Sequence, residues 1–161
     1  MYTTLIDTVA LSKLDKENLV IVDCRFSLAD VNAGSRAYVE SHIAGAIYAS
    51  LDNDLSSAPL TDHGRHPLPS PEALIALFSR MGISDGTQVV AYDDVNGMVA
   101  SRLWWMLRYM GHTAVSVLDG GWQAWQAATL PTTSGIESPS PAKFSGQPRR
   151  DWLILHGEVP T

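Results

Sequence analysis

The stretch VVAYDDVNGMVASRLWWMLRYMGH, residues 89–112, decides the fold. It begins with four strand-forming residues, 89–92, and from Met98 onward almost every side chain is apolar. An apolar strand that passes through a short turn into an apolar helix is typical of the parallel sheets of α/β proteins. Two adjacent carboxylates, Asp93 and Asp94, stand in the turn. The stretch therefore predicts a strand–turn–helix unit with an acidic junction.

Strand and helix patterns alternate along the rest of the chain. Four segments have the apolar composition of buried strands: 19–23, 46–49, 87–92 and 114–118. Three segments carry helical spacing or helix-end signals: 70–82, 98–110 and 120–129. In the first of these, Ser70 is a favourable N-cap, Pro71 suits the first helical position and Gly82 ends the pattern. The alternation predicts a three-layer α/β fold, in which helices flank a mainly parallel central sheet.

The composition favours one folded domain. The 161 residues are 45% hydrophobic and 17% charged, with a formal net charge of −6. This length is enough to bury a core, and this composition is unlike that of a disordered chain. Lys and Arg are not concentrated in any stretch, and no apolar run approaches the ~20 residues of a membrane span. We therefore expect no nucleic-acid partner and no membrane partner.

Cys24 is the only cysteine in the sequence. A single cysteine excludes an internal disulfide and a multi-cysteine metal site, and the N-terminus MYTTLID lacks the regions of a signal peptide. We therefore expect a reducing, cytoplasmic location. The neighbouring Arg25 would favour a reactive thiolate, whereas most free cysteines are buried and inert. Two interpretations stay open: a buried structural thiol and an exposed sulfur carrier.

The acids of the 89–112 stretch stand where an α/β protein holds its ligand. Ligands lie beyond the carboxyl ends of parallel strands, and helix N-termini attract anions. A carboxylate of Asp93 or Asp94 would itself take the anion position, and Gly97 would ease close backbone approach. A second anion ~4 Å away would meet a repulsion of about 4 kcal/mol at an effective dielectric of ~20. The acids therefore discourage the binding of thiosulfate, phosphate or sulfate at this turn. The alternative is that Asp93 and Asp94 only cap the helix and lie in a solvated turn.

No residue pattern predicts a metal or a cofactor. A Mg²⁺ site of the receiver-domain type needs a lysine on a later strand, but the only lysines are Lys13, Lys16 and Lys143. The spacing of His, Asp and Glu does not resemble a zinc or di-iron site. His42, in ESHIAGAIY, is interpreted as fastening a turn. We expect no bound metal and no cofactor.

The long polar connection 50–70 holds a second group of candidate residues. Asp52 lies near its start, and His63, Arg65 and His66 lie near its end. Connections of this length are often functional. A carboxylate, a guanidinium and an imidazole together orient a substrate or relay a proton. The alternative is a polar surface loop pinned by salt bridges.

Five segments of the chain form a recognisable series: VIVDCRF (20–26), YVESHIAGAIY (38–48), GRHPLPSPEAL (64–74), VVAYDDVNGMVASRLWWMLRYMGH (89–112) and VSVLDGGWQAW (115–125). In this order they resemble the signatures of a rhodanese domain, above all the N-terminal domain of the tandem-domain thiosulfate and 3-mercaptopyruvate sulfurtransferases. The resemblance covers residues 1–130. It implies the rhodanese-like version of the three-layer α/β fold.

The residues after this domain have a different character. The stretch 131–150 holds four prolines among Ser, Thr and Gly, which is linker composition. The tail 151–161, DWLILHGEVPT, has the pattern of a beginning strand and resembles the entry into a second rhodanese domain. We expect an interdomain linker followed by the start of a second domain, so that the chain is the first part of a longer protein.

The resemblance implies that the catalytic nucleophile is missing from this domain. Active rhodanese domains begin the turn with a cysteine, whose persulfide is cradled by backbone N–H groups. Here the position is held by Asp93, counted forward from Tyr92, or by Asp94, counted back from Gly97. The pseudo-active loop comprises Asp93, Asp94, Val95, Asn96, Gly97 and Met98. The resemblance therefore implies a catalytically silent domain, in which Cys24, part of the first signature, is no substitute.

The resemblance also assigns roles outside this turn. In tandem members the second domain carries the catalytic cysteine, and the active site lies between the domains. Asp52 and His66 match an aspartate and a histidine that assist a serine of the second domain in the mercaptopyruvate enzymes, here in a loop a few residues longer. Arg65 is a further candidate on the substrate side. Structural positions of the family are matched by Asp23, Arg25 and His42.

The implied parent reaction is sulfur transfer. Sulfane sulfur passes from thiosulfate or 3-mercaptopyruvate, through a cysteine persulfide, to cyanide or another thiol. The implied partners are a second rhodanese domain and a small anionic sulfur donor. Without the second domain, we expect exposed apolar side chains near the long connection and the Asp93–Asp94 turn. The alternative is a stand-alone pseudo-rhodanese that only docks or regulates other proteins.

Overall fold

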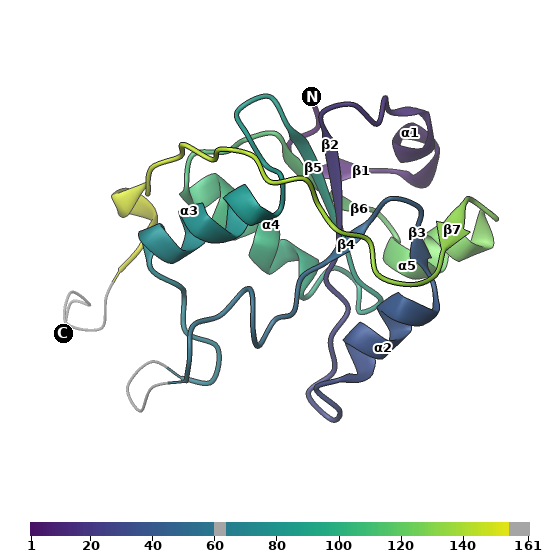
Figure 1. Ribbon diagram of the computed structural model, residues 1–161, viewed down its shortest axis with the longest axis horizontal. Coiled ribbons are helices and arrows are strands. Elements are labelled where there is room, and N and C mark those ends of the chain that lie inside the picture. The colour runs from purple at the N-terminus through teal and green to yellow at the C-terminus, as the bar shows by residue number, and fades with distance from the viewer. Residues whose placement is uncertain (60–63, 155–161) are drawn as a thin grey trace.

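A five-stranded parallel sheet forms the centre of the computed structural model, which describes residues 1–59 and 64–154 (Figure 1). The strand order is β1-β6-β5-β2-β4, and every neighbouring pair is parallel. The strands are β1 (Leu5–Ile6), β2 (Leu19–Asp23), β4 (Ile47–Tyr48), β5 (Gln88–Tyr92) and β6 (Val115–Leu118). The mainly parallel sheet predicted from the sequence is confirmed.

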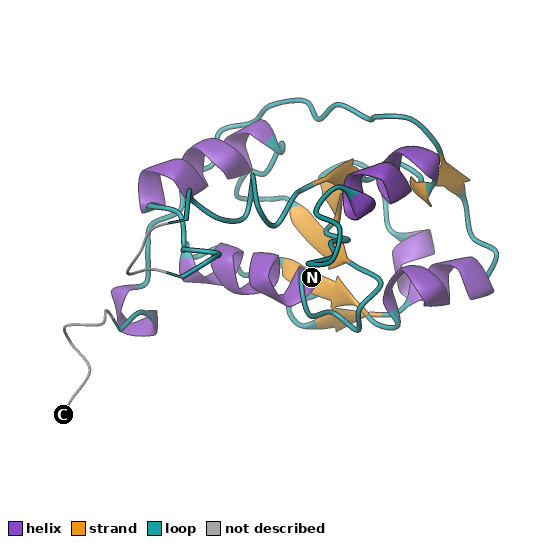
Figure 2. Cartoon of the chain, turned by 90° about the horizontal axis from the view of Figure 1, so that it is seen from below, coloured by secondary structure: helices purple, strands orange, loops and turns teal. Residues whose placement is uncertain are grey.

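Helices cover both faces of this sheet (Figure 2). One core lies between the sheet and the helices α3 (Pro71–Arg80) and α4 (Ala100–Tyr109). The other core lies between the sheet and α1 (Thr8–Lys13) and α5 (Gly121–Ala127), and it contains Trp122 and Trp125. Successive residues of β5 alternate between the two cores, as a strand buried on both faces must. The three-layer α/β fold is therefore confirmed.

The sheet register brings the candidate segments together at the carboxyl ends of the strands. Asp23 pairs with Tyr92 on one side and with Tyr48 on the other. The carboxyl ends of β2, β5 and β4 are therefore level. The chain leaves these ends into Cys24, into the Asp93 turn and into the long connection, so the predicted site residues meet at one end of the sheet.

Helix-end signals in the sequence were read correctly for α3. The Ser70 hydroxyl accepts a hydrogen bond from the Ala73 N–H at 3.2 Å, Pro71 occupies the first helical position, and Gly82 follows with a φ of +85°. The helix predicted over 98–110 begins later, at Ala100. The turn before it first passes through left-handed conformations at Asn96 and Gly97, which a regular helix cannot include.

Several short elements were not predicted. They are β1, α1, α2 (Ala33–Glu40), β3 (His42–Ile43), β7 (Thr132–Thr133) and the 3₁₀ turn η1 (Arg150–Trp152). The strands among them are two residues long, which is too short for an alternating pattern to be visible. The beginning strand expected from residue 151 is wrong for the described part, because η1 occupies it; residues 155–161 lie outside the described residues.

The proline-rich stretch 131–150 lies along the domain. Its strand β7 pairs antiparallel with β3. Further on, the buried ring of Phe144 packs edge-to-face on Phe78 of α3, with 5.0 Å between ring centroids. The Arg149 N–H then donates to the Tyr109 carbonyl at the end of α4. The stretch is therefore an ordered strap over the domain (Figure 1), and its predicted role as an interdomain linker stays a prediction.

Candidate functional site

The side chain of Asp93 is enclosed by backbone N–H groups. It is 1% exposed. Its Oδ1 accepts hydrogen bonds from Val95 at 2.9 Å and Gly97 at 2.8 Å. Its Oδ2 accepts from Val99 and Ala100, both at 2.8 Å. These donors belong to the turn and to the start of α4, where free N–H groups and the helix dipole favour negative charge.

Backbone geometry explains why the turn closes on this one carboxylate. Asn96 and Gly97 both have positive φ, and they wrap the chain around the end of β5. On the other side, the Trp122 N–H donates to the Asp93 carbonyl at 2.9 Å. A Cβ at Gly121 would lie 2.4 Å from that carbonyl oxygen, so glycine is required for α5 to approach.

Counting along the turn left Asp93 and Asp94 as alternatives for the cysteine position, and the surroundings of the two acids differ in the structure. Asp93 lies inside the ring of donors. Asp94 is half-buried, and its carbonyl oxygen accepts a hydrogen bond from the Gln123 side chain at 2.7 Å. Met98, at the end of the same turn, is 77% exposed, which agrees with the expected apolar surface here. The anion position is therefore taken by the chain's own Asp93 carboxylate.

The single thiol lies below the surface next to this turn. Cys24 is fully buried, and its Sγ contacts the Val22 carbonyl at 3.9 Å. Burial raises the pKa of the thiol, and the nearby carboxylates of Asp23 and Asp93 raise it further. The exposed sulfur carrier considered from the sequence needs an accessible thiolate, and this geometry does not supply one.

Asp23 and Arg25 form a buried ion pair at the end of β2. The Arg25 guanidinium donates to both Asp23 oxygens at 2.6–3.1 Å and to the Ser41 carbonyl at 2.6 Å. It also lies over the Trp122 ring, 4.4 Å from its centroid. Burial raises the pKa of Asp23, although the bonds from Arg25 oppose this. The pair ties β2 to the loop after α2 and to α5, which fits the structural role predicted for both residues.

His42 fastens the strap to the domain. Its ring stacks on Tyr38 at 4.0 Å, and its Nδ1 lies 2.8 Å from the Tyr38 carbonyl. Its Nε2 contacts the Glu137 carboxylate and lies 3.0 Å from the Thr133 hydroxyl. Burial raises the pKa of Glu137, but hydrogen bonds from His42, Thr133 and the Gly45 N–H outweigh it, so the pKa is lowered. The histidine holds a turn, as interpreted from the sequence; its partner Glu137 was missed.

Asp52 and His66 meet in the long connection. The His66 Nε2 lies 2.7 Å from the Asp52 Oδ1, and the two side chains are 18% and 31% exposed, respectively. The imidazole and the Phe26 ring are perpendicular, with 5.9 Å between ring centroids. Arg65 is exposed, and His63 lies outside the described residues. The structure therefore brings together the carboxylate and the imidazole, and both side chains are partly exposed.

A cavity of about 550 Å³ opens beside this pair. It is lined by His66 and by the outer side of α4, including Ser101, Arg102, Trp104 and Trp105. Arg102 was not among the candidate residues predicted from the sequence. The polar lining next to His66 and the apolar lining along the tryptophans make this the cavity associated with the candidate residues.

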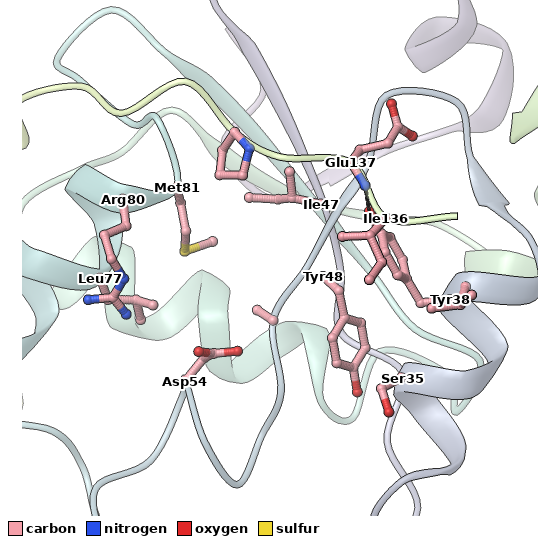
Figure 3. A pocket seen from close by; sticks show the side chains of 13 residues that line it. Ser35, Tyr38, Ile47, Tyr48, Asp54, Leu77, Arg80, Met81, Ile136 and Glu137 are labelled. Carbon is pink, nitrogen blue, oxygen red and sulfur yellow. Dashed lines mark hydrogen bonds between the residues drawn. The ribbon is translucent and has the colours of Figure 1, made fainter. Parts of the chain in front are cut away.

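A second cavity, of about 340 Å³, lies between α2, β4, α3 and the strap (Figure 3). Tyr48, Asp54, Arg80 and Ile136 line it, whereas Asp52, His66 and Asp93 do not. Burial raises the pKa of Tyr48, whose hydroxyl donates to the Arg25 carbonyl at 2.8 Å. This cavity does not belong to the candidate site.

The described residues hold neither a cluster of metal ligands nor a membrane-spanning helix. Within residues 1–59 and 64–154, no three or more His, Cys, Asp or Glu side chains gather as metal ligands. No helix in the same part of the chain has the length and the apolar character to cross a bilayer. The candidate groups rest on their own geometry: the Asp52–His66 pair and the cavity that His66 lines.

Comparison with known proteins gives a consistent likeness. The model of the rhodanese-like domain family matches residues 8–128. A probable 3-mercaptopyruvate sulfurtransferase of Pseudomonas aeruginosa is 44% identical over 146 residues, covering 89% of this chain and 51% of that protein. The human 3-mercaptopyruvate sulfurtransferase is 40% identical over 114 residues, covering 70% and 37%.

A solved structure shares the fold. The 3-mercaptopyruvate sulfurtransferase from Leishmania major superimposes with a TM-score of 0.79 at 35% identity, over 91% of this chain and 40% of that one. The chain thus spans about half, or less, of the length of the relatives that it matches.

Proposed function

The chain belongs to the rhodanese family of sulfurtransferases, and from that premise we propose that it is the non-catalytic rhodanese domain of a thiosulfate or 3-mercaptopyruvate sulfurtransferase. In this role it helps to form an active site with a second domain that carries the cysteine. A reducing cytoplasm remains part of this proposal, because the single cysteine forms no internal disulfide.

The observation that carries the silent role is the state of the Asp93 turn. A carboxylate already accepts four N–H groups that would otherwise face a bound anion. It offers no sulfur nucleophile, and it repels thiosulfate. The remaining thiol, Cys24, is buried and its raised pKa keeps it protonated. Sulfur transfer then has to take place on a cysteine supplied by another domain.

The chemistry of the two donors differs in its need for a proton. When a thiolate attacks the sulfane sulfur of thiosulfate, the S–S bond breaks and sulfite leaves with the electron pair. When it attacks the sulfur of 3-mercaptopyruvate, the C–S bond breaks, and the enolate of pyruvate must take up a proton. A positioned acid–base pair therefore assists the second reaction far more than the first.

The Asp52–His66 pair supplies such a group in this proposal. Asp52 accepts the Nε2–H proton of His66, which leaves Nδ1 with its lone pair. A carboxylate that orients a histidine in this way fixes the tautomer and stabilises the imidazolium when it forms. By the resemblance to the mercaptopyruvate enzymes, the free nitrogen serves a serine of the second domain, which passes the proton to the product.

A chimera tests this proposal. The matched region of this chain replaces its counterpart in the Pseudomonas aeruginosa relative, and turnover is measured with both donors. We expect Asp52→Asn and His66→Gln to lower kcat with 3-mercaptopyruvate by about 100-fold or more and to change kcat with thiosulfate little. Asn53→Ala, an exposed neighbour of Asp52, is the matched control. Equal loss with both donors, or no loss with 3-mercaptopyruvate, would contradict the proposed role.

A further inference from the structure

We propose that Arg102 is the positioning residue of the Asp52–His66 pair: it joins the two parts of the long connection that carry these side chains and holds them against α4. The inference rests on the proposed function for its significance, because Asp52 and His66 have a role in sulfur transfer only there. The geometry itself concerns Arg102 and its hydrogen bonds.

Arg102 bonds both halves of the connection at once. Its Nε donates to the Leu55 carbonyl at 2.9 Å, three residues after Asp52. Its Nη2 donates to the carbonyl of His66 at 3.0 Å and to that of Pro67 at 3.3 Å. The planar fork of a guanidinium offers donors to several acceptors from one rigid group. One helical side chain therefore fixes the backbone of the histidine and the backbone next to the aspartate.

The connection needs such support because little regular structure holds it. Asp52 and His66 are 14 positions apart, and the described residues between them form turns, bends and one isolated bridge, at Gly64. The Asp52 side is a tight turn closed by Ser50, which accepts from Leu55 N–H at 2.9 Å. Besides Arg102, a backbone bond from Ser57 to Pro67 at 3.0 Å joins the two sides. Arg102 adds the contact that places both sides relative to the sheet.

The carbonyl oxygens of the connection stabilise the charge of the half-buried Arg102 guanidinium. The residue is half-buried, and burial lowers its pKa. Among residues 1–59 and 64–154, no carboxylate lies within 4.0 Å of its guanidinium. Its charge is thus stabilised by carbonyl oxygens of the connection, through charge-assisted bonds stronger than neutral ones. The three hydrogen bonds from this half-buried guanidinium to backbone carbonyls point to a role in holding those carbonyls.

The position of Arg102 is itself fixed by the acidic turn. Asp93 accepts the N–H of Ala100, two residues before Arg102, and of Val99. The Arg102 N–H in turn donates to the Val99 carbonyl at 3.0 Å. The first turn of α4 is therefore anchored to the end of β5. Through this anchor the silent Asp93 turn determines where Arg102, and with it His66, stands.

The test measures the Asp52–His66 hydrogen bond directly. The ring ¹⁵N chemical shifts of His66 report which nitrogen carries the proton, and hydrogen exchange reports how long the Nε2 proton persists. In the unaltered chain, we expect the Nε2–H tautomer and slow exchange. We expect Arg102→Gln to give mixed tautomers and to speed the exchange at least about tenfold. Arg102→Lys, which keeps the charge but loses the planar fork, should do the same.

Arg108→Gln is the matched control, because Arg108 lies on the same helix but over Trp104, and donates to Thr3 rather than to the connection. It should leave the His66 ring signals unchanged. The inference is overturned if the Arg102 variants keep the tautomer and the slow exchange, or if Arg108→Gln disturbs them equally. If Arg102→Gln does not fold, Arg102→Lys decides.

A further measurement needs no substitution. In the unaltered chain, the Arg102 Nε proton should be protected from exchange together with the His66 ring proton, and a rapidly exchanging Arg102 Nε proton would also overturn the inference. None of these readouts requires sulfur transfer. The positioning role of Arg102 can therefore be confirmed even if the chimera shows that Asp52 and His66 are dispensable for turnover. It can also be overturned while the Asp52–His66 pair remains essential for turnover.

Discussion

The Asp93 turn and the long connection with Asp52 and His66 each place a carboxylate beyond the carboxyl ends of the strands, but the two carboxylates have different tasks. Asp93 is 1% exposed, and its oxygens are filled by the backbone of its own turn. Asp52 is 31% exposed and contacts the Nε2 of His66, whose side chain is 18% exposed. A carboxylate satisfied by buried N–H groups stabilises the fold, whereas we propose that one in contact with a partly buried histidine orients that histidine for chemistry on a second molecule.

The largest expected change comes from giving the Asp93 turn a sulfur nucleophile. Asp93→Cys, made together with Cys24→Ala, places the only thiol among the N–H donors, where the pKa of a thiol is lowered. We expect this variant to gain one sulfur atom from thiosulfate with release of sulfite, seen by intact mass. Asp94→Cys in the same background is the control and should gain none. A folded Asp93→Cys variant that takes up no sulfur would contradict the claim that the Asp93 turn lacks only a thiol to accept sulfur.

Removal of the Asp93 carboxylate should strongly destabilise the domain. Asp93→Ala leaves four N–H groups without their acceptor, two of them at the buried start of α4. We expect the free energy of unfolding to fall by at least about 3 kcal/mol, measured with urea. Asp94→Ala should change it by no more than about 1 kcal/mol. Similar losses in the two variants would show that the ring of donors is not what stabilises the turn.

The His42–Glu137 contact provides a carboxylate–imidazole pair with a structural task. Hydrogen bonds hold the pKa of Glu137 below its usual 4.5 in the folded state, despite the opposing effect of burial. The ionised group therefore adds stability that is complete above 4.5 and is lost as the pH falls through the lowered folded value. Glu137→Gln should flatten the acid limb of a stability–pH curve measured between about pH 3 and pH 6.

Glu40→Gln, an exposed glutamate of α2, should leave that acid limb as it is in the unaltered chain. An unchanged limb in Glu137→Gln would mean that the strap is held by its other contacts, such as the buried Phe144.

The smallest expected change in stability belongs to the connection. Asp52→Asn and His66→Gln should each lower the free energy of unfolding by less than about 1 kcal/mol, because the pair is partly exposed to water. Urea unfolding of this chain measures it, with Asn53→Ala beside them. A loss as large as that of Asp93→Ala would assign the pair to the fold and remove the contrast between the two regions.

Much of the fold follows from the sequence. Apolar runs and helix-end residues were enough for β2, β4, β5 and β6 and for α3, α4 and α5, since burial and capping are local effects. Of the predicted strand 46–49, only Ile47–Tyr48 is paired. The other two-residue strands, β1, β3 and β7, and the strap escaped detection because partners distant in sequence form them. His42 and Glu137, for example, are 95 positions apart.

The site was less accessible to sequence reasoning. The count along the turn allowed Asp93 or Asp94, and only the left-handed conformations of Asn96 and Gly97 put Asp93 among the donors. Arg102 was missed because its partners are backbone carbonyls 35 to 47 positions away, which no residue pattern reveals. Asp52 and His66, by contrast, were paired as candidates by the family resemblance, and their side chains lie 2.7 Å apart. Their role stays a prediction.

The most direct test of the silent-domain proposal is the intact mass of the unaltered chain after incubation with thiosulfate, with a parallel assay for thiocyanate after addition of cyanide. We predict no added sulfur and no thiocyanate, because the turn holds a carboxylate and the only thiol is buried. A gain of one sulfur atom that Cys24→Ser abolishes would contradict the proposal and would make Cys24 a working persulfide carrier.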